Sequence, residues 1–201
     1  MKKCFLVCLL ISICSVTFFA QPKVTKEEYF IYAIVLKQIY ADKWKDSKLS
    51  FVIINNTYMS ESADLGEAKR FEGLIRSFKQ RNQVSAILNH SFPTKYQYKI
   101  TTMDEVNGLL KLGAQEFEEA QKKRIAPLVG GGESWNKFSE KFTDSQGYLQ
   151  LSRVGFSKNK EFAFVYVKNI GPSHFNSMNY ILRKIKGQWK LHIRYGSGGI
   201  S

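Results

Sequence analysis

The sequence predicts an α+β fold in which N-terminal helices pack on a C-terminal antiparallel β-meander of about four strands, with a cone or half-barrel outline. Before residue 144, apolar side chains recur mostly at helical spacing, whereas from Tyr148 onward they alternate with polar ones. Short polar connections separate the alternating runs, as in a meander of adjacent strands. We expect one domain over residues 21–201, with a helix-rich part at 21–144, an antiparallel sheet at 148–195 and a flexible tail at 196–201.

The first twenty residues have the composition of a secretory signal peptide. Lys2 and Lys3 precede an uncharged run from Cys4 to Ala20. We expect cleavage near Ala20–Gln21 and export to the periplasm or the extracellular space. Phe18 occupies a position where signal peptidase prefers a small residue, so an uncut N-terminal membrane anchor is the alternative.

All three cysteines, Cys4, Cys8 and Cys14, lie inside this segment. The mature chain therefore has none, which excludes disulfide frameworks, cysteine nucleophiles, thiolate zinc sites and iron–sulfur clusters. Neither Cys8 nor Cys14 follows a small residue, so a lipoprotein is less favoured than a cleaved signal or an anchor.

The first helix is predicted over residues 24–44. Thr25 and Glu28 have the spacing of a capping box, and Val24 and Tyr29 that of a hydrophobic staple. Apolar residues cover most sides of this helix, so we expect it to be buried. A membrane-surface helix is the alternative, but such helices carry a basic polar face that this segment lacks.

The next segments carry local signals for two strands and two helices. β-branched and aromatic residues stop at Asn55 and Asn56, which is typical of a strand. Asp64 and Glu67 then precede apolar residues at helical spacing, and Pro93 closes a turn. The predictions are a strand at 49–58, a helix at 64–82, a short helix with a turn at 84–93 and a strand at 95–102.

Two more helices are predicted before the sheet, at 103–126 and 134–142. The second should place Trp135, Phe138 and Phe142 on its inner face. Between them, the glycine-rich run at 128–134 is a flexible joint. A phosphate-binding loop would require Lys followed by Ser or Thr after the glycines, and the chain has Glu133 there.

Four strands follow, at 148–156, 161–169, 178–186 and 188–195. The first two form a structural hairpin whose turn is "SKNKE", and the last turn centres on Lys186-Gly187 or Gly187-Gln188. Alternation in the last hairpin divides its side chains between two faces. One face is apolar and contains Tyr180, Leu182, Trp189, Leu191 and Ile193.

The other face of the last hairpin is a candidate anion-binding surface. Residues 145–201 contain nine Lys or Arg and one acid, Glu161, so most of the net charge of +13 lies near the C-terminus. Spaced cations on one side of a strand suit a phosphate, sulfate or carboxylate. A solvated outer face of a half-buried sheet has the same appearance. The candidate residues are Arg153, Arg183, Lys190, His192 and Arg194.

No catalytic or metal motif is present. The three histidines, His90, His174 and His192, show no metal-ligand spacing, and no G-x-S-x-G elbow occurs. We therefore predict no cofactor and no metal. The alternative function is a small hydrolase-like enzyme that uses His174 or His192 as general base in a cleft of the sheet.

The C-terminal part resembles a group of uncharacterised bacterial exported proteins. The resemblance covers residues 134–193 and implies export and an α+β architecture, with no activity attached. Two features differ: "GPSHFNSMN" replaces a glycine-rich loop, and the chain ends in "GSGGIS" instead of Trp-Ile-Ser. The matching positions are Trp135, Phe138, Gly147, Ser152 to Phe156, Val165 to Val167, Tyr180, Leu182, Gly187 and Trp189.

These observations together predict an exported, non-catalytic binding module associated with the cell envelope. Its expected partner is an anionic envelope or extracellular ligand. Nucleic acid is a less favoured partner, because the glycine-containing aromatic signature of nucleic-acid-binding sheets is absent. Membrane contact is expected only through an uncut N-terminal segment.

Overall fold

The protein is described by a computed structural model over residues 22–43, 50–58, 65–89, 91–122 and 132–199. The strands in these residues are β1 (Phe51–Ile54), β2 (Tyr98–Thr101), β3 (Tyr148–Leu151), β4 (Gly155–Phe156), β5 (Phe162–Gly171), β6 (His174–Ile185) and β7 (Gln188–Gly199). The α-helices are α1 (Lys26–Lys43), α2 (Leu74–Arg81), α3 (Met103–Lys122) and α4 (Asn136–Lys141), and the 3-10 helices are η1 (Glu67–Arg70) and η2 (Glu133–Trp135).

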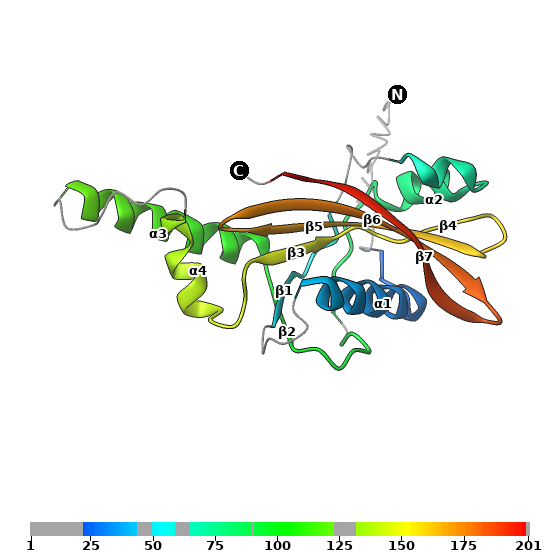
Figure 1. Ribbon diagram of the computed structural model, residues 1–201, viewed down its shortest axis with the longest axis horizontal. Helices are drawn as coiled ribbons and strands as arrows, with labels where there is room; N and C mark the ends of the chain where they lie inside the picture. Colours follow the sequence, from blue (N-terminus) through cyan, green and yellow to red (C-terminus); the bar gives the residue numbers. More distant parts are fainter. Residues whose placement is uncertain (1–21, 44–49, 59–64, 90, 123–131, 200–201) are drawn as a thin grey trace, which may run out of the picture.

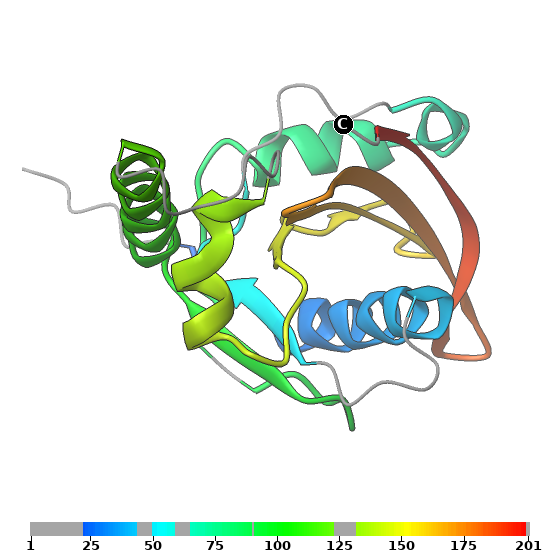
Figure 2. The ribbon, with the colours of Figure 1, turned by 60° about the vertical axis from the view of Figure 1, so that its left-hand side comes forward.

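The strands form one sheet in the order β2-β1-β3-β5-β6-β7, and β4 pairs with β5. Helices α1 and α2 lie on opposite faces of this sheet, while α3 and α4 lie together at one end (Figure 1). Figure 2 shows the long strands curving around α1. None of the described helices has the length and apolar composition needed to span a bilayer.

The α+β class is confirmed, but the predicted meander of about four antiparallel strands is wrong in number and topology. The sheet has seven strands among the described residues, and β1 pairs in parallel with both β2 and β3. It is therefore a mixed, open sheet with β2 and β7 at its edges. Alternation along a strand predicts which side chains are buried but not which strand lies next to it, so the parallel edge could not be predicted.

Helix α1 begins as predicted. The Thr25 backbone N–H donates to Glu28 Oε2 at 2.9 Å, and the Glu28 N–H donates to Thr25 Oγ1 at 3.3 Å, which completes the capping box. Val24 and Tyr29 of the staple are both buried. Tyr32, Val35 and Leu36 bring the helix into the main apolar cluster.

The segment between β1 and β2 differs from its prediction. The single helix expected at 64–82 is divided into η1 and α2, because Gly73 adopts a left-handed conformation with φ 76°. No helix forms over residues 84–89. Ile87 bridges Asn56, and the Ala86 N–H donates to Thr57 Oγ1 at 2.8 Å, so this stretch lies extended beyond β1. Of the glycine-rich joint predicted at 128–134, residues 128–131 lie outside the described residues, and Glu133 already begins η2. The tail predicted at 196–201 begins too early, because β7 continues to Gly199, and only residues 200–201 lie outside the described residues.

The C-terminal strands follow the predicted order. β3 and β4 both pair with β5, and the chain reverses after Ser157 with Lys160 at φ 56°. Ile185 pairs with Gln188, so the last turn is Lys186-Gly187. Both turn residues have positive φ, as a two-residue hairpin requires.

A β-bulge in β7 places the residues after His192 on the faces opposite to those predicted. Ile181 pairs with Ile193 and Leu182 with Leu191, which leaves His192 as the extra residue. One extra residue moves every later side chain to the opposite face. Ile193 accordingly packs under α2, away from the face of Trp189 and Leu191 on the α1 side.

Three apolar clusters hold the elements together. The largest lies between α1 and one face of the sheet, and another lies between α2 and the other face. The third joins β1 and β3 to α3 and α4 and contains Phe138 and Phe142, as predicted. Because both faces of β5 are covered, Phe164 and Val165 are fully buried on opposite sides.

Candidate functional site

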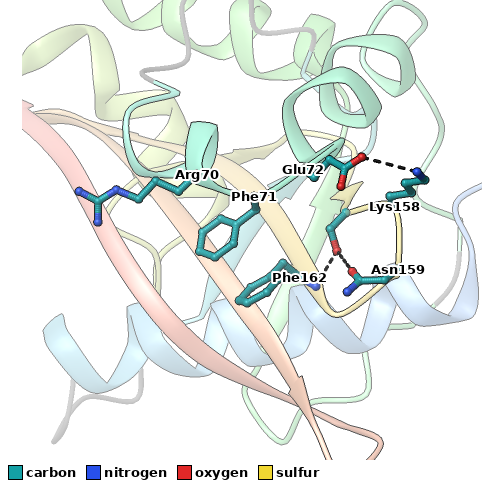
Figure 3. A pocket seen from close by; sticks show the side chains of 7 residues that line it. Arg70, Phe71, Glu72, Lys158, Asn159 and Phe162 are labelled. Atoms are coloured by element: carbon teal, nitrogen blue, oxygen red, sulfur yellow. Dashed lines mark hydrogen bonds and ion pairs between the residues drawn. The ribbon is translucent and has the colours of Figure 1, made fainter.

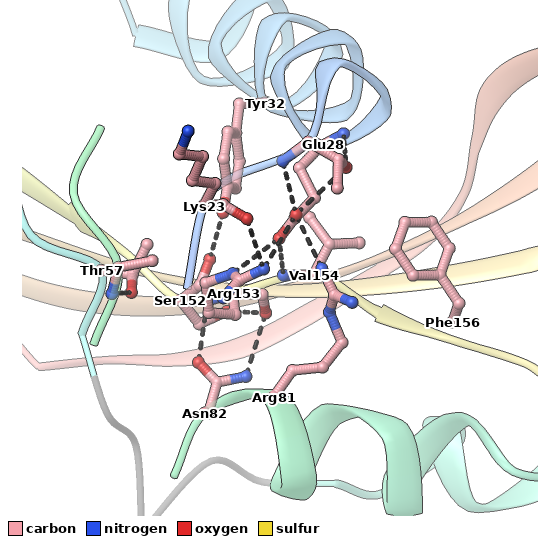
Figure 4. Close-up of polar contacts among 12 residues, drawn as sticks. Lys23, Glu28, Tyr32, Thr57, Arg81, Asn82, Ser152, Arg153, Val154 and Phe156 are labelled. Atoms are coloured by element: carbon pink, nitrogen blue, oxygen red, sulfur yellow. Dashed lines mark hydrogen bonds and ion pairs between the residues drawn. The ribbon is translucent and has the colours of Figure 1, made fainter. Parts of the chain in front are cut away.

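The structure separates Arg153 from the other predicted site residues. Arg153 is 4% exposed and lies in the core beside Glu28, which is fully buried (Figure 4). Its Nε donates to Glu28 Oε1 at 2.9 Å and its Nη2 to Glu28 Oε2 at 3.1 Å. Such a bidentate pair suits the planar guanidinium. Arg153 is therefore part of the scaffold and does not belong to a surface for ligands.

Further donors saturate the Glu28 carboxylate. Arg81 Nη2 donates at 2.7 Å, the Val154 N–H at 3.3 Å and the capping Thr25 N–H at 2.9 Å. The carboxylate therefore joins the first turn of α1, the last turn of α2 and the segment between β3 and β4. Three parts of the fold meet at one charge.

Side chains add to the backbone bonds that hold the break between β3 and β4, where the Ser152 N–H still donates to the Tyr166 carbonyl. Asn82 accepts from the Arg153 N–H at 2.7 Å and donates to the Arg153 carbonyl at 3.1 Å. Ser152 Oγ accepts from the Tyr166 N–H at 2.9 Å, and Tyr32 donates to the Ser152 carbonyl at 2.8 Å. These bonds satisfy buried backbone groups that the interrupted strand would leave unpaired.

The network also lowers the pKa of Glu28. Burial by itself would raise it, but the hydrogen bonds from Arg153 and Thr25 and the charges of Arg153 and Arg81 outweigh burial, and the pKa falls below its ordinary value of 4.5. At Tyr32, burial and the nearby charge of Glu28 outweigh the opposing charges of Arg153 and Arg81, and the pKa is raised well above 10.0. Glu28 is thus held ionised and Tyr32 protonated.

The pH dependence of stability should report this lowered pKa. A carboxylate whose pKa is lower in the folded state contributes stability that is fully present above its ordinary value of 4.5 and is lost as pH falls through the folded-state pKa. We expect the difference in free energy of unfolding between wild type and Glu28→Gln to be largest at neutral pH and to shrink in acid. Urea denaturation across a pH series measures it. A difference independent of pH would contradict this account.

The remaining predicted cations are exposed but do not share one face. Arg183 pairs with Lys190 and, on its other side, with Phe162, so these residues lie on the α2 side of the sheet. Arg194 pairs with Tyr180, whose ring belongs to the α1 side, because the bulge at His192 reverses the alternation. The predicted single cationic face is therefore wrong for Arg194.

A basic groove lies on the α2 side, between η1 and α2 and the turn from β4 to β5. It consists of two adjoining hollows of about 400 and 810 Å³, which share Phe71, Glu72, Ser157 and Lys158. Figure 3 shows the residues that line the smaller hollow. Among the described residues that line it, Glu72 is the only acid. Six lining residues are cationic: Lys69, Arg70, Arg76, Arg81, Lys158 and Lys160.

The groove cations are only partly neutralised. Lys158 lies 3.6 Å from Glu72, but both side chains are about 80% exposed, so this pair is weak. Arg70 pairs with Glu67, and Arg81 with Glu28. Within the described part of the chain, Lys69, Arg76 and Lys160 form no ion pair.

An aromatic pair forms one wall of the groove. Phe71 stacks on Phe162 with ring centroids 4.0 Å apart. The Arg183 guanidinium lies 5.6 Å from the Phe162 centroid, and the His192 ring lies 5.8 Å from it. Two of the predicted residues, Arg183 and His192, thus border the groove at its aromatic wall.

Sequence reasoning missed the groove because its cations come from two distant segments. Lys69 and Arg76 are seven residues apart, which could have indicated a shared face of a helix. Lys158 and Lys160 lie in a turn that alternation assigns only to a loop. Their meeting depends on Gly155, which lets β4 pass directly against the backbone of α2 at Phe78.

The two described histidines, His174 and His192, lie in different surroundings. His192 is exposed and its ring contacts Phe71 and Phe162, while His174 Nε2 lies 3.1 Å from the amide oxygen of Asn169. His90 is outside the described residues. Among the residues described, no group of His, Cys, Asp and Glu could hold a metal ion.

The fold and the groove define a mixed-sheet α+β protein with an open, cation-lined depression. Comparison with protein-family models, curated proteins and solved structures finds no match for this chain. The groove geometry is consequently the basis for any inference about function.

Proposed function

We propose that this protein is an exported, non-catalytic binding module that holds an anionic ligand in the groove beside α2. The observation that carries the proposal is the six-to-one excess of Lys and Arg over acids among the described residues of the groove lining. Clustered cations in a depression attract anions and raise their local concentration. Export remains part of the proposal on the basis of the N-terminal uncharged run.

The shape of the groove favours an extended polyanion. The hollows are open, and their cations are distributed between η1 and α2 on one side and the β4–β5 turn on the other. A linear chain of phosphate, sulfate or carboxylate groups can contact several of these cations in succession, with its rings or apolar parts against Phe71 and Phe162. The exposed position of His192 beside these rings supports a binding surface over the hydrolase alternative in which His192 is the general base.

Charge reversal in the groove should reduce polyanion binding. We expect Lys69→Glu with Arg76→Glu to weaken binding of heparin and of a single-stranded oligonucleotide to the chain that begins at Gln21. All described contacts lie after that residue. For the oligonucleotide, loss of two phosphate contacts should flatten the slope of log affinity against log salt by about 1.4. Fluorescence anisotropy across a salt series measures both affinity and slope.

The matched control places the same charge change elsewhere. Lys37 lies on α1 and Lys111 on α3, and both are exposed and absent from the groove. Lys37→Glu with Lys111→Glu should leave the slope nearly unchanged. If both variants lost the same amount of polyanion affinity, binding would depend only on total charge, and the groove would have no special role. Lipopolysaccharide as a competitor tests whether an envelope polyanion occupies the same groove.

A further inference from the structure

A second surface lies where the β6–β7 turn meets the start of α1. We call it the hairpin end, and it comprises Lys26, Phe30, Lys184, Ile185, Lys186, Trp189 and Lys190. Phe30 is 48% exposed and Ile185 is 43% exposed, and Ile185 lies between Lys184 and Lys186 in the sequence. The β6–β7 turn projects beyond α1 at one end of the molecule (Figure 1).

Phe30 and Trp189 form part of an apolar hollow of about 650 Å³ between α1 and the hairpin. Ile34 lines the same hollow. Ile185 lies on the opposite face of the hairpin, because its neighbour Lys184 pairs with Trp189. The turn therefore presents apolar side chains on both of its faces. Shallow insertion of this turn into an apolar layer would bury them together.

Basic residues surround these apolar side chains. Lys26, Lys186 and Lys190 are exposed, and none of them forms an ion pair with another described residue. The acid within the hollow, Glu27, is engaged by Lys184 at 2.8 Å and by the Trp189 indole N–H at 3.0 Å. Glu161 is the other nearby acid, and its carbonyl accepts from the Lys184 N–H. The surface thus retains an excess of positive charge.

We propose that the hairpin end docks on an anionic membrane surface. Exposed aromatic and aliphatic side chains ringed by lysines match the headgroup layer, where rings enter the acyl boundary and ammonium groups reach lipid phosphates. Each lysine near such a surface adds to the electrostatic attraction. This contact is separate from the groove and does not depend on its ligand.

Vesicle binding tests the proposal with two variants of the hairpin end. The chain from Gln21 is mixed with vesicles of phosphatidylcholine alone or with phosphatidylglycerol, and bound protein is separated by flotation. We expect wild type to bind the anionic vesicles. Phe30→Gln with Ile185→Thr should lower the partition coefficient at least about tenfold, since one buried side chain of this size accounts for about a factor of ten. Lys186→Glu with Lys190→Glu should also remove binding, without touching the apolar residues.

The controls change similar residues at the other end of the molecule. Leu112 of α3 and Ile100 of β2 are 52% and 39% exposed, so Leu112→Gln with Ile100→Thr matches the apolar variant in both helix and strand. This control, and the groove variant Lys69→Glu with Arg76→Glu, should bind as wild type does. Absence of wild-type binding, or equal binding by the hairpin-end variants, would overturn the proposal. Equal binding to neutral vesicles would overturn the role of the lysines.

Discussion

Replacing Arg153 with methionine should lower the free energy of unfolding by about 3–5 kcal/mol, because it leaves a buried carboxylate without its bidentate partner. Arg153 supplies two of the hydrogen bonds to Glu28, and a third guanidinium contact reaches the Lys23 carbonyl at 3.3 Å. Arg81 remains beside Glu28 but approaches it through one nitrogen only. The folded state therefore loses most of the compensation for burying that charge.

Urea denaturation followed by circular dichroism measures this loss. Arg183→Met is the matched control, since Arg183 is exposed and its removal should change the free energy of unfolding by less than about 0.5 kcal/mol. The double variant Glu28→Leu with Arg153→Met should be more stable than the single Arg153 variant, because both buried charges are then gone. If Arg153→Met lowered the free energy of unfolding less than Arg183→Met does, the buried Glu28 carboxylate would not require Arg153 for its stabilisation.

Gly155→Ala should be the second costly substitution, lowering the free energy of unfolding by about 1–3 kcal/mol through overpacking. A Cβ at this position would lie 2.6 Å from Phe78 Cβ and 2.8 Å from the Phe78 backbone nitrogen. Backbone cannot rotate away as a side-chain end does, so α2 must shift from β4. Because α2 forms one side of the basic groove, polyanion affinity should fall together with stability.

The control substitution is expected to raise the free energy of unfolding instead of lowering it. Gly108 lies inside α3, and a Cβ there would meet nothing within 4 Å. Gly108→Ala should therefore raise the free energy of unfolding by about 0.5–1 kcal/mol through helix propensity alone. Thermal denaturation of both variants compares the two effects. A stable Gly155→Ala protein with unchanged polyanion affinity would contradict the close packing of β4 on α2.

Several elements were predictable because their signals lie within a few residues of one another. The Thr25–Glu28 capping box begins α1 as predicted, and the Lys186-Gly187 turn joins the last hairpin. Trp135, Phe138 and Phe142 recur at helical spacing and lie together against β1 and β3. Such patterns depend on the spacing of residues in the sequence, so they can be recognised without knowing which elements pack against them.

Two misplaced site residues show the limit of these patterns. His192 takes a bulge position, which moves Arg194 to the α1 side although alternation places both on one face. Arg153 belongs by composition to the basic C-terminal part, yet its partner Glu28 is 125 residues away. Neither a bulge nor an ion pair between distant residues can be recognised from the local composition or from the periodicity of apolar residues.

Local sequence signals were sufficient for the α+β class, the absence of cysteine after residue 20, the first helix with its cap and the hairpins of the C-terminal half. Contacts between distant segments were needed for the parallel edge of β1 and β2, the burial of Arg153, and the groove that joins Lys69 and Arg76 with Lys158 and Lys160. The two groups of features differ in the sequence separation of the residues that interact. Caps, turns and periodicity are energies between near neighbours, whereas strand order, buried ion pairs and grooves arise from contacts between segments that meet only when the whole chain packs.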